Sequence, residues 1–221
     1  MADLAVRGLV VRYPGLDQPA LSVPELDLPG GVRVALTGPS GSGKTTFLNL
    51  LTGLERIPAG SVAWDKVELS SLGESARDRW RAGAVGLVMQ DFHLFPGLSA
   101  LDNVLLPQRL ARWRTPADLP AAGRALLERV GILRPGQRVE TLSRGQMQRV
   151  AVARALVGRP RIVIADEPTA SLDAEAGAAV AELLAELAAE TGATLIVATH
   201  DPRLTARLDG ALRLDAGRLA A

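Results

Sequence analysis

The sequence predicts an α/β fold, with a parallel sheet covered by helices on both faces. Four short apolar runs carry this prediction, because they are rich in Val, Ile and Leu and do not alternate with polar residues, which is typical of strands buried on both faces. Helical patterns lie between these runs, and alternation of strands with helices favours parallel pairing. The four runs are Val32–Leu36, Val85–Met89, Ile162–Ala165 and Leu195–Ala198.

Three segments between or after these runs predict helices. Thr45–Leu54 follows the first run directly. Gln146–Val157 precedes the third run and is followed by Gly158 and then Pro160, residues that commonly end a helix. Glu175–Glu190 is rich in Ala, Leu and Glu and has a helical period of apolar residues. The strands and helices therefore alternate along most of the chain.

Two parts of the chain depart from this alternation. Residues 91–158 contain several prolines and several helical segments but no convincing strand, which predicts a mostly helical subdomain inserted into the sheet domain. Residues 5–28 contain short alternating patches and prolines, which predict an antiparallel β extension at the N-terminus. A length of 221 residues and a mass of 23.2 kDa suit one large domain with such an insertion.

The composition excludes several classes of function. Apolar residues make up 48% and charged residues 22%, as in globular proteins, and the net charge of +1 does not support a nucleic-acid binder that works through a global basic field. The absence of Cys excludes disulfide scaffolds, Cys-ligated zinc, iron–sulfur clusters and thiol nucleophiles, and two His disfavour a multi-His metal site. No apolar run approaches the roughly 18–20 residues of a membrane span, and the N-terminus lacks a long apolar signal region. We expect a chain that does not cross a membrane but can sit on one through a partner.

A glycine-rich loop after the first apolar run matches the phosphate-binding pattern G-x-x-x-x-G-K-[ST]. Its glycines let backbone N–H groups turn towards phosphate oxygens, and the helix that follows directs its positive end at the same anion. Lys44, one of only two lysines among 25 basic residues, stands where the pattern needs a charge for the β- and γ-phosphates, and Thr45 offers a hydroxyl to Mg²⁺. The predicted nucleotide-binding residues of this loop are Gly38, Ser40, Gly41, Ser42, Gly43, Lys44, Thr45 and Thr46.

Polar residues end the last two apolar runs. Asp166 and Glu167 follow Ile162–Ala165, at the strand end that faces the ligand crevice of a parallel sheet. Asp166 is placed to hold Mg²⁺, and Glu167 is placed to polarise an attacking water. His200 follows the next run and is expected to reach the same crevice. His93 sits among apolar residues, and we interpret it as a packing or partner-surface residue.

The segment Leu142–Gln146, with sequence LSRGQ, closely resembles the LSGGQ signature of ATP-binding cassette (ABC) ATPases. The other motifs follow in the order of that family over essentially the whole chain: Tyr13, the phosphate loop, Gln90, the signature, the acidic pair, Asp173 and His200. The resemblance implies the ABC ATPase fold, with residues 1–221 as a single domain. It divides them into a nucleotide-binding core, 1–90 and 159–221, and a helical subdomain, 91–158, that carries the signature.

The resemblance also implies roles for individual residues. Gln90 would touch Mg²⁺ or the attacking water, Glu167 would be the catalytic base, and His200 would be the switch histidine near the γ-phosphate. Tyr13 would stack on adenine, although packing in a β layer is the alternative, since aromatic residues usually bury for area alone. The residues implied to act across a dimer interface are Ser143, Gly145, Gln146 and Asp173.

The mechanism implied by the resemblance needs two copies. They face each other head to tail and trap two ATP molecules, so that each site joins one protomer's phosphate loop to the other's signature helix, where Ser143 donates or caps. Mg²⁺ is the expected cofactor beside ATP. A single cassette without a membrane span implies a subunit that works in the cytoplasm, peripherally on the inner face of the cell membrane, through a separate integral-membrane permease.

One position departs from the signature, and the subgroup follows from a further segment. Arg144 replaces a glycine, and it either points outward harmlessly or alters the closed dimer. Residues 86–104 are similar to the group of lipoprotein-release, macrolide-export and cell-division cassettes, in which the loop Phe92–Pro96 would receive the membrane subunit. The alternative for Phe92, Leu94 and Phe95 is burial in the core.

Two other classes of function are alternatives for a chain with a phosphate loop. A soluble ABC-type ATPase acting on nucleic acid or the ribosome usually needs coiled-coil arms, zinc modules or a second cassette, and 221 residues without Cys leave no room for them. A small-molecule kinase would explain Lys44 but not the signature, Asp173 or His200. Arg109, Arg112 and Arg114 could form a nucleic-acid patch, but a solvated helical face is the simpler interpretation, so no nucleic-acid partner is expected.

Overall fold

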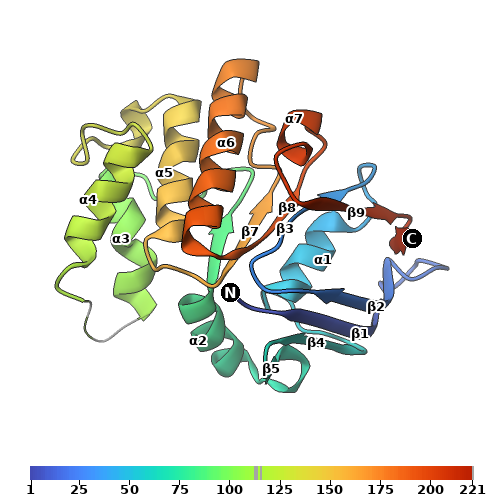
Figure 1. The fold of residues 1–221 in the computed structure, drawn as a ribbon. Helices are drawn as coiled ribbons and strands as arrows, with labels where there is room; N and C mark the ends of the chain where they lie inside the picture. Colours follow the sequence, from blue (N-terminus) through green and yellow to red (C-terminus); the bar gives the residue numbers. More distant parts are fainter. Residues whose placement is uncertain (112–113, 115, 221) are drawn as a thin grey trace.

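The four apolar runs form the parallel part of the sheet in a computed structural model that describes residues 1–111, 114 and 116–220. The strands lie side by side in the order β3 (Arg33–Thr37), β8 (Thr194–Ala198), β7 (Ile162–Asp166) and β6 (Val85–Val88) (Figure 1). Each neighbouring pair is parallel. The predicted α/β fold with a parallel sheet is confirmed, with each strand within two residues of its predicted bounds.

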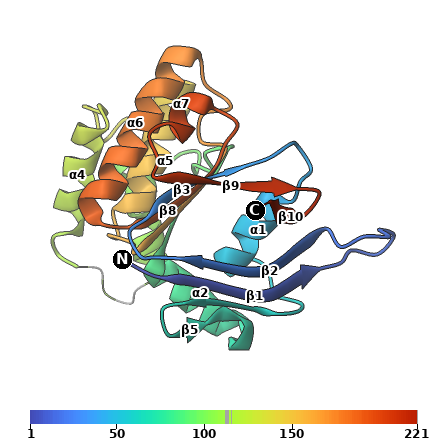
Figure 2. The same cartoon turned by 45° about the vertical axis from the view of Figure 1, so that its right-hand side comes forward.

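The N-terminal part of the sheet is antiparallel, as predicted. β1 (Leu4–Val11) lies between β2 (Leu21–Leu28) and β4 (Ser61–Trp64), and β4 pairs with the short β5 (Val67–Glu68). All these pairs are antiparallel. Figure 2 shows β1 and β2 reaching away from the parallel strands.

Two C-terminal strands that the sequence analysis did not identify join the halves into one ten-stranded sheet. β9 (Gly210–Asp215) pairs in parallel with β3, and β10 (Arg218–Ala220) pairs antiparallel with β9 and in parallel with β2. The complete strand order is β5-β4-β1-β2-β10-β9-β3-β8-β7-β6.

The parallel strands separate two hydrophobic cores, because successive side chains of a strand point to opposite faces. Ile162 and Ile164 belong to the core beneath α1 (Lys44–Leu51), whereas Val163 and Ala165 belong to the core of the helices on the other face. The helices on that face include α5 (Arg144–Leu156) and α6 (Ala174–Thr191). The three predicted helices are therefore confirmed.

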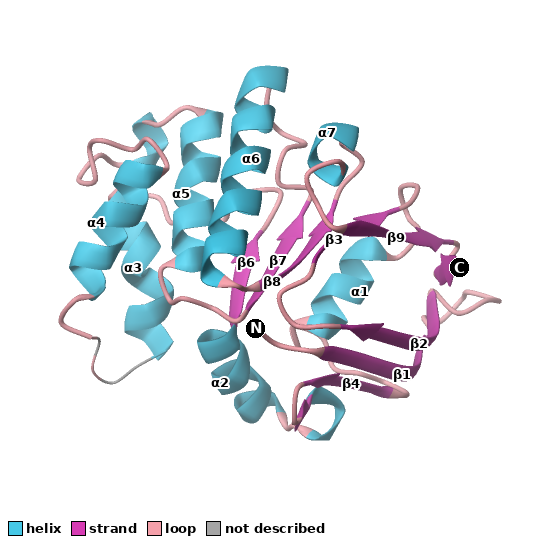
Figure 3. Cartoon of the chain, viewed as in Figure 1, coloured by secondary structure: helices cyan, strands magenta, loops and turns pink. Residues whose placement is uncertain are grey.

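The inserted helical subdomain is also present. α3 (Ala100–Ala111), α4 (Leu119–Arg129) and α5 pack against one another, with a 3₁₀ turn at Val139–Thr141, and Figure 3 shows these helices gathered beside the strands. In the part of residues 91–158 that the structure describes, β pairing is limited to an isolated bridge between Ser99 and Arg138. The exact bounds of the core and the subdomain stay a prediction.

Two helices, α2 (Glu74–Ala84) and α7 (Pro202–Thr205), were not predicted from the sequence. α2 follows a 3₁₀ turn at Leu69–Ser71, has no fully buried side chain and consists mostly of polar, charged and small residues. α7 is a single turn. Among the described residues, none of the helices has both the length and the apolar character needed to cross a membrane.

Candidate functional site

The carboxyl ends of the parallel strands meet the start of α1 at a cavity of about 310 Å³. Three segments far apart in the sequence line it: the glycine-rich loop with the first residues of α1, Gln90 two residues after β6, and the end of β7 with the residue that follows it. Open α/β sheets bind ligands at this edge. Every lining residue is one that the sequence singled out: Ser40, Gly41, Gly43, Lys44, Thr45, Thr46, Gln90, Asp166 and Glu167.

The glycine-rich loop can take its shape only with glycine at particular positions. Gly38 has φ 147° and Gly43 has φ 97°, both in the region that L side chains rarely adopt. A Cβ atom on Gly38 would lie 2.0 Å from the carbonyl oxygen of Leu214 and 2.9 Å from Oγ of Ser42. At Gly38 the loop therefore packs directly against the backbone of β9, and Ser42 of the loop is buried.

The start of α1 supplies a positive helix end to this cavity. Gly43 is the N-cap and makes no side-chain cap, and the first turn contains no acidic residue. The first helical hydrogen bond runs from Phe47 N to Gly43 O at 2.9 Å, and the N–H groups before it have no acceptor within the helix. An anion in the cavity can accept from these N–H groups and is stabilised by the helix dipole.

Lys44 places a cation against the same loop. Its Nζ donates to the carbonyl oxygens of Gly38 at 2.9 Å and Pro39 at 3.0 Å. These acceptors are neutral, so the positive charge of Lys44 is held at the cavity without being cancelled by them. The arrangement suits a ligand with several negative charges, such as a polyphosphate.

Thr45 and Asp166 bring two side-chain oxygen atoms together in the lining of the same cavity. Thr45 Oγ1 donates to Asp166 Oδ2 at 2.8 Å. Burial raises the pKa of the Asp166 carboxyl, as does the nearby Glu167, whereas the hydrogen bond from Thr45 and the charge of Lys44 lower it in part. A buried carboxylate whose ionised form is disfavoured gains from a nearby cation, and hydroxyl and carboxylate oxygens are ligands that Mg²⁺ prefers. The residues present therefore fit a magnesium ion.

Glu167 is held in a fixed and unusual backbone conformation. Its φ is 46°, in the left-handed region, and its N–H donates to Ala198 O on β8 at 2.9 Å. Non-glycine residues in this region are strained and often mark functional sites. Its Oε2 lies 2.8 Å from Nδ1 of His200; 16% of the Glu167 side chain is exposed, against 73% for His200. The structure thus brings the predicted acidic pair and the predicted histidine together.

Gln90 reaches the cavity just before a strained turn. Phe92 and His93, two and three residues later, have φ values of 54° and 46°. Arg154 on α5 donates to the carbonyl oxygens of both residues, at 2.6 Å for Phe92. Arg154 could not be identified from the sequence, because a left-handed backbone at non-glycine residues leaves no signal there.

The signature residues lie outside this cavity, at the start of α5. Ser143 is the N-cap of α5, as expected: its Oγ accepts from Gln146 N at 3.2 Å, and its own N–H donates to Gln146 Oε1 at 2.9 Å. A Cβ on Gly145 would lie 3.2 Å from Cβ of Ala176 on α6, so these two helix starts are close. Asp173 caps α6 through hydrogen bonds from the N–H groups of Glu175 and Ala176.

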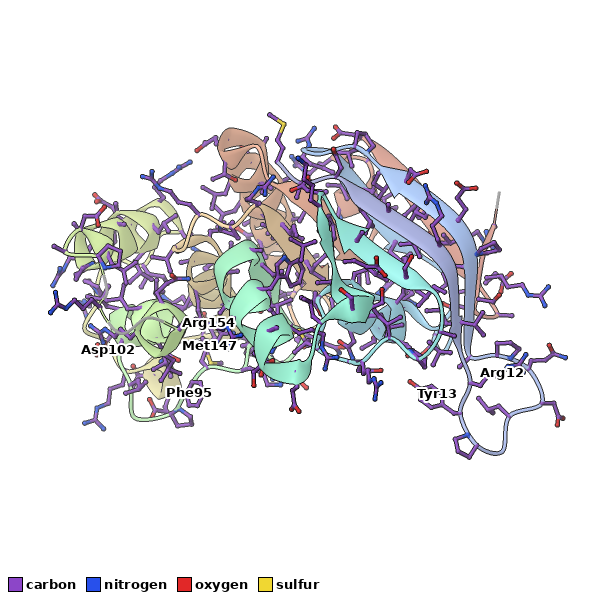
Figure 4. The ribbon with its side chains drawn as sticks, turned by 90° about the horizontal axis from the view of Figure 1, so that it is seen from below. Arg12, Tyr13, Phe95, Asp102, Met147 and Arg154 are labelled. Atoms are coloured by element: carbon purple, nitrogen blue, oxygen red, sulfur yellow. The ribbon has the colours of Figure 1, made fainter. Side chains whose placement is uncertain are left out.

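Tyr13 lies in the turn between β1 and β2, next to Arg12, and does not line the cavity (Figure 4). It is 43% exposed, so the alternative that it packs in a β layer is wrong. Exposure leaves its ring available for stacking on a planar ligand.

The loop Phe92–Pro96 is partly core and partly surface. Phe92 is only 8% exposed, whereas Phe95 is 55% exposed and His93 is also exposed. Burial in the core is therefore right for Phe92 and wrong for Phe95, and packing is wrong for His93. Figure 4 shows Phe95 near Asp102, Met147 and Arg154, at the opposite end of the view from Tyr13.

Two of the three arginines considered as a nucleic-acid patch, Arg109 and Arg114, lie in the described residues, and one of them is paired with a carboxylate. Arg109 of α3 pairs with Asp102 at 2.9 Å, and Arg114 is exposed after the helix. The hydrogen bonds from Ser99 and Arg109 lower the pKa of Asp102, so this pair is charged at neutral pH. Arg112 lies outside the described residues.

Comparison with known proteins gives a consistent result. A protein-family model described as ABC transporter matches residues 21–170. The chain is 42% identical over 200 residues to a lipoprotein-releasing system ATP-binding protein LolD of Syntrophotalea carbinolica, covering 90% of this chain and 88% of the relative. It is 45% identical over 199 residues to the uncharacterized ABC transporter ATP-binding protein YbbA of Escherichia coli, covering 88% and 86%.

A solved structure shares the whole fold. The dimeric structure of a post-hydrolysis state of the ATP-binding cassette MJ0796, bound to ADP and Pi, superimposes with a TM-score of 0.89 at 31% sequence identity. The match covers 99% of this chain and 97% of that one. The topology described above is therefore that of an ATP-binding cassette.

Proposed function

The chain belongs to the ABC transporter family, as an ATP-binding cassette of the lipoprotein-release group, and from this membership we propose how its residues divide the work of ATP hydrolysis. The protein is an ATPase subunit of a transporter. The observation that carries the assignment of its site is the convergence of nine residues from three separate segments on one cavity.

The phosphate loop and the start of α1 bind the triphosphate of ATP. The N–H groups at the helix start donate to phosphate oxygens, and Lys44 exchanges its hydrogen bonds with Gly38 and Pro39 for the β- and γ-phosphates. The 43% exposure of Tyr13 supports stacking of its ring on adenine. Because the Tyr13 loop is separate from the cavity, it would contact the base and not the phosphates.

Asp166, Thr45 and Gln90 would hold Mg²⁺ beside the phosphates. The ion, when bound, draws electron density from the γ-phosphate and neutralises charge that develops on it. The chain's own contribution is a pair of oxygen atoms 2.8 Å apart on Thr45 and Asp166, in a wall whose burial favours a cation. The amide oxygen of Gln90 adds a ligand or orients water.

Glu167 is the general base for the attacking water. The hydrogen bond from Glu167 N–H to Ala198 O fixes its backbone, so that its carboxylate stays at the cavity edge. Its Oε2 contacts His200 Nδ1. His200, exposed and close to Glu167, orients this carboxylate and is free to reach a γ-phosphate. A positioned carboxylate base contributes about 100- to 10,000-fold to the rate of such a step.

Two copies of the chain close head to tail over the nucleotides. The signature residues Ser143, Gly145 and Gln146 do not line the phosphate cavity of their own chain, and they form a second capped helix start that suits an anion. A nucleotide can therefore contact both motifs when the signature comes from a second copy. The dimeric form of the similar cassette MJ0796 supports this arrangement.

A separate membrane subunit is the partner that ATP hydrolysis drives. By the family relationship it would dock at the loop around Phe95, and the 55% exposure of that aromatic ring supports an apolar contact there. Through this permease the chain would act at the inner face of the cell membrane. The names of its relatives favour lipoprotein release as the process served.

A soluble cassette ATPase acting on nucleic acid or the ribosome is the weaker candidate. The relatives are transporter and lipoprotein-release subunits, and the match covers 86–90% of their length as well as of this chain. The Arg109–Asp102 pair also neutralises one of the arginines that a nucleic-acid surface would use.

Turnover of purified variants tests the site. We expect Glu167→Gln to bind ATP as the wild type does and to hydrolyse it at least about 100-fold more slowly. The matched control, Glu128→Gln, changes an exposed carboxylate on α4 and should keep full turnover. Full activity of Glu167→Gln would remove that residue from the role of base.

Membrane association in cells tests the docking surface. Phe95→Asp should move the protein from the membrane fraction to the soluble fraction, because it places a charge on the exposed aromatic contact. Leu16→Asp is the control, since Leu16 is 56% exposed, close to the 55% of Phe95, but lies in the β1–β2 loop. Equal distribution of both variants and the wild type would contradict the assignment of this surface.

A further inference from the structure

Arg144 occupies the position where the chain departs from the LSGGQ signature, and its side chain contacts two neighbouring loops. It is the first residue of α5, directly after the Ser143 cap. A cation in the first turn of a helix opposes the helix dipole, so an arginine here costs stability unless it makes compensating contacts. The structure shows two such contacts, and both lead to loops that belong to the catalytic machinery.

The first contact is with the loop that carries Gln90. The guanidinium carbon of Arg144 lies 5.4 Å from the centre of the Phe92 ring, within the range of a cation–π interaction. Phe92 is buried and has a left-handed backbone, and its carbonyl accepts from Arg154 at 2.6 Å. Two arginines of α5 therefore contact this strained turn: Arg154 binds the backbone carbonyl of Phe92, and Arg144 contacts the ring of Phe92.

The second contact is with the loop that leads to Asp173. Arg144 Nε donates to the carbonyl oxygen of Ser171 at 3.2 Å. Ser171 lies four residues after Glu167 and two before Asp173, which caps α6. One side chain thus bridges the signature helix, the turn after Gln90 and the loop between the catalytic base and the dimer interface.

We propose that Arg144 is a positioning residue that couples the signature helix to Gln90 and to the Asp173 loop within one protomer. When the signature engages the nucleotide of the second copy, a shift of the α5 start is passed through the Phe92 ring towards Gln90 and through Ser171 towards Asp173. This inference rests on the proposed head-to-tail dimer for its part in turnover, but the ties themselves exist in the single chain. A glycine at this position could make neither contact.

A double-mutant cycle on the full chain tests the coupling in turnover. Arg144→Leu should lower kcat about fivefold, the effect expected from losing one cation–π contact and one exposed hydrogen bond, and Phe92→Leu, which loses only the cation–π contact, should lower it about threefold. KM for ATP should stay within about twofold, because neither change touches the phosphate loop. The double variant should be no slower than the slower single variant, because both changes break the same tie.

The matched control is Arg124→Leu, which removes an exposed arginine from α4 and should leave kcat unchanged. If the effects of Arg144→Leu and Phe92→Leu multiply, or if Phe92→Leu has no effect, Arg144 acts on the nucleotide directly and the proposal is wrong.

Hydrogen exchange of the nucleotide-free protein tests the ties without any turnover. The backbone amides of Phe92 and Leu172 donate to Met89 O and Thr169 O. Their exchange rates should rise in Arg144→Leu and should equal those of the wild type in Arg124→Leu. Unchanged exchange at both amides in Arg144→Leu overturns the proposal. A wild type without ATPase activity would contradict the proposed function instead, and the exchange result would still decide whether Arg144 ties the loops.

Discussion

Replacing Lys44 by Met removes the one charge that the phosphate loop holds over its cavity. Met keeps most of the length of the side chain, so the change deletes the ammonium group with little change of shape. In the nucleotide-free protein, Lys44 Nζ donates to Gly38 O at 2.9 Å and to Pro39 O at 3.0 Å. Binding of ATP exchanges these two neutral contacts for contacts with a charged phosphate.

The size of the effect follows from these contacts. A unit charge pair about 4 Å apart is worth roughly 4 kcal/mol at the effective dielectric constant of about 20 that suits sites near a protein surface. Giving up two hydrogen bonds of about 1 kcal/mol each leaves a net gain of about 2 kcal/mol. This corresponds to roughly 30-fold in the dissociation constant of ATP, and further phosphate charges near Lys44 increase it.

Titration calorimetry with ATP measures this difference directly. Lys66→Met is the matched control, because Lys66 is the only other lysine of the chain and lies exposed in the turn between β4 and β5. We expect Lys66→Met to bind like the wild type and Lys44→Met to bind at least about 30-fold more weakly. A Lys44→Met variant whose dissociation constant lies within about threefold of the wild type would refute the assignment of the loop.

Three further variants probe the cavity and the core beneath it. Burial raises the pKa of Asp166 above its ordinary value of 3.8, so in the nucleotide-free protein the ionised form lowers stability as the pH rises from that ordinary value through the raised pKa. Asp166→Asn should therefore raise the melting temperature at pH 7, and the gain should vanish below about pH 3, where the carboxyl is protonated in both the folded and the unfolded state. A gain that persists below about pH 3 would contradict this explanation. Gly38→Ala should lower the free energy of unfolding by about 1–3 kcal/mol and weaken ATP binding, because its Cβ would meet Leu214 O at 2.0 Å; unchanged binding would show that the loop tolerates the side chain. Phe47→Ala, at a fully buried position of α1, should cost about 3–5 kcal/mol in urea denaturation, and a loss below about 1 kcal/mol would mean that this core can collapse around the gap.

The central part of the fold is predictable because its signals are local. Runs such as Ile162–Ala165 are apolar at every position, since both faces of their strands are buried in different cores. The phosphate loop is predictable for a similar reason, because each glycine and Lys44 is required by its own geometry or charge. Ser143 could be placed as a cap because the capping box lies within four consecutive residues.

The parts that could not be predicted depend on distant contacts. β10 is only three residues long, and a single pairing with Ser22 of β2 completes the sheet. α2 buries no side chain completely, and its residues are mostly polar, charged or small, so its sequence contains few of the apolar residues that mark a packed helix.

The strained turn at Phe92 is hidden for the same reason. It exists because Arg154, more than sixty residues later in the sequence, satisfies its carbonyl groups. The contacts of Arg144 with Phe92 and Ser171 likewise depend on tertiary structure, so the sequence could show only that a glycine was missing.

The mass of Glu167→Gln in solution, measured by light scattering with and without ATP in the absence of Mg²⁺, shows whether two copies of the chain share the nucleotides. We expect ATP to double the 23.2 kDa mass of the chain, because each nucleotide joins one phosphate loop to the signature of a second copy. Glu167→Gln combined with Ser143→Arg should still bind ATP and stay monomeric, since a bulky side chain then blocks the signature. A Glu167→Gln protein that binds ATP and remains at the mass of one chain would contradict the composite site.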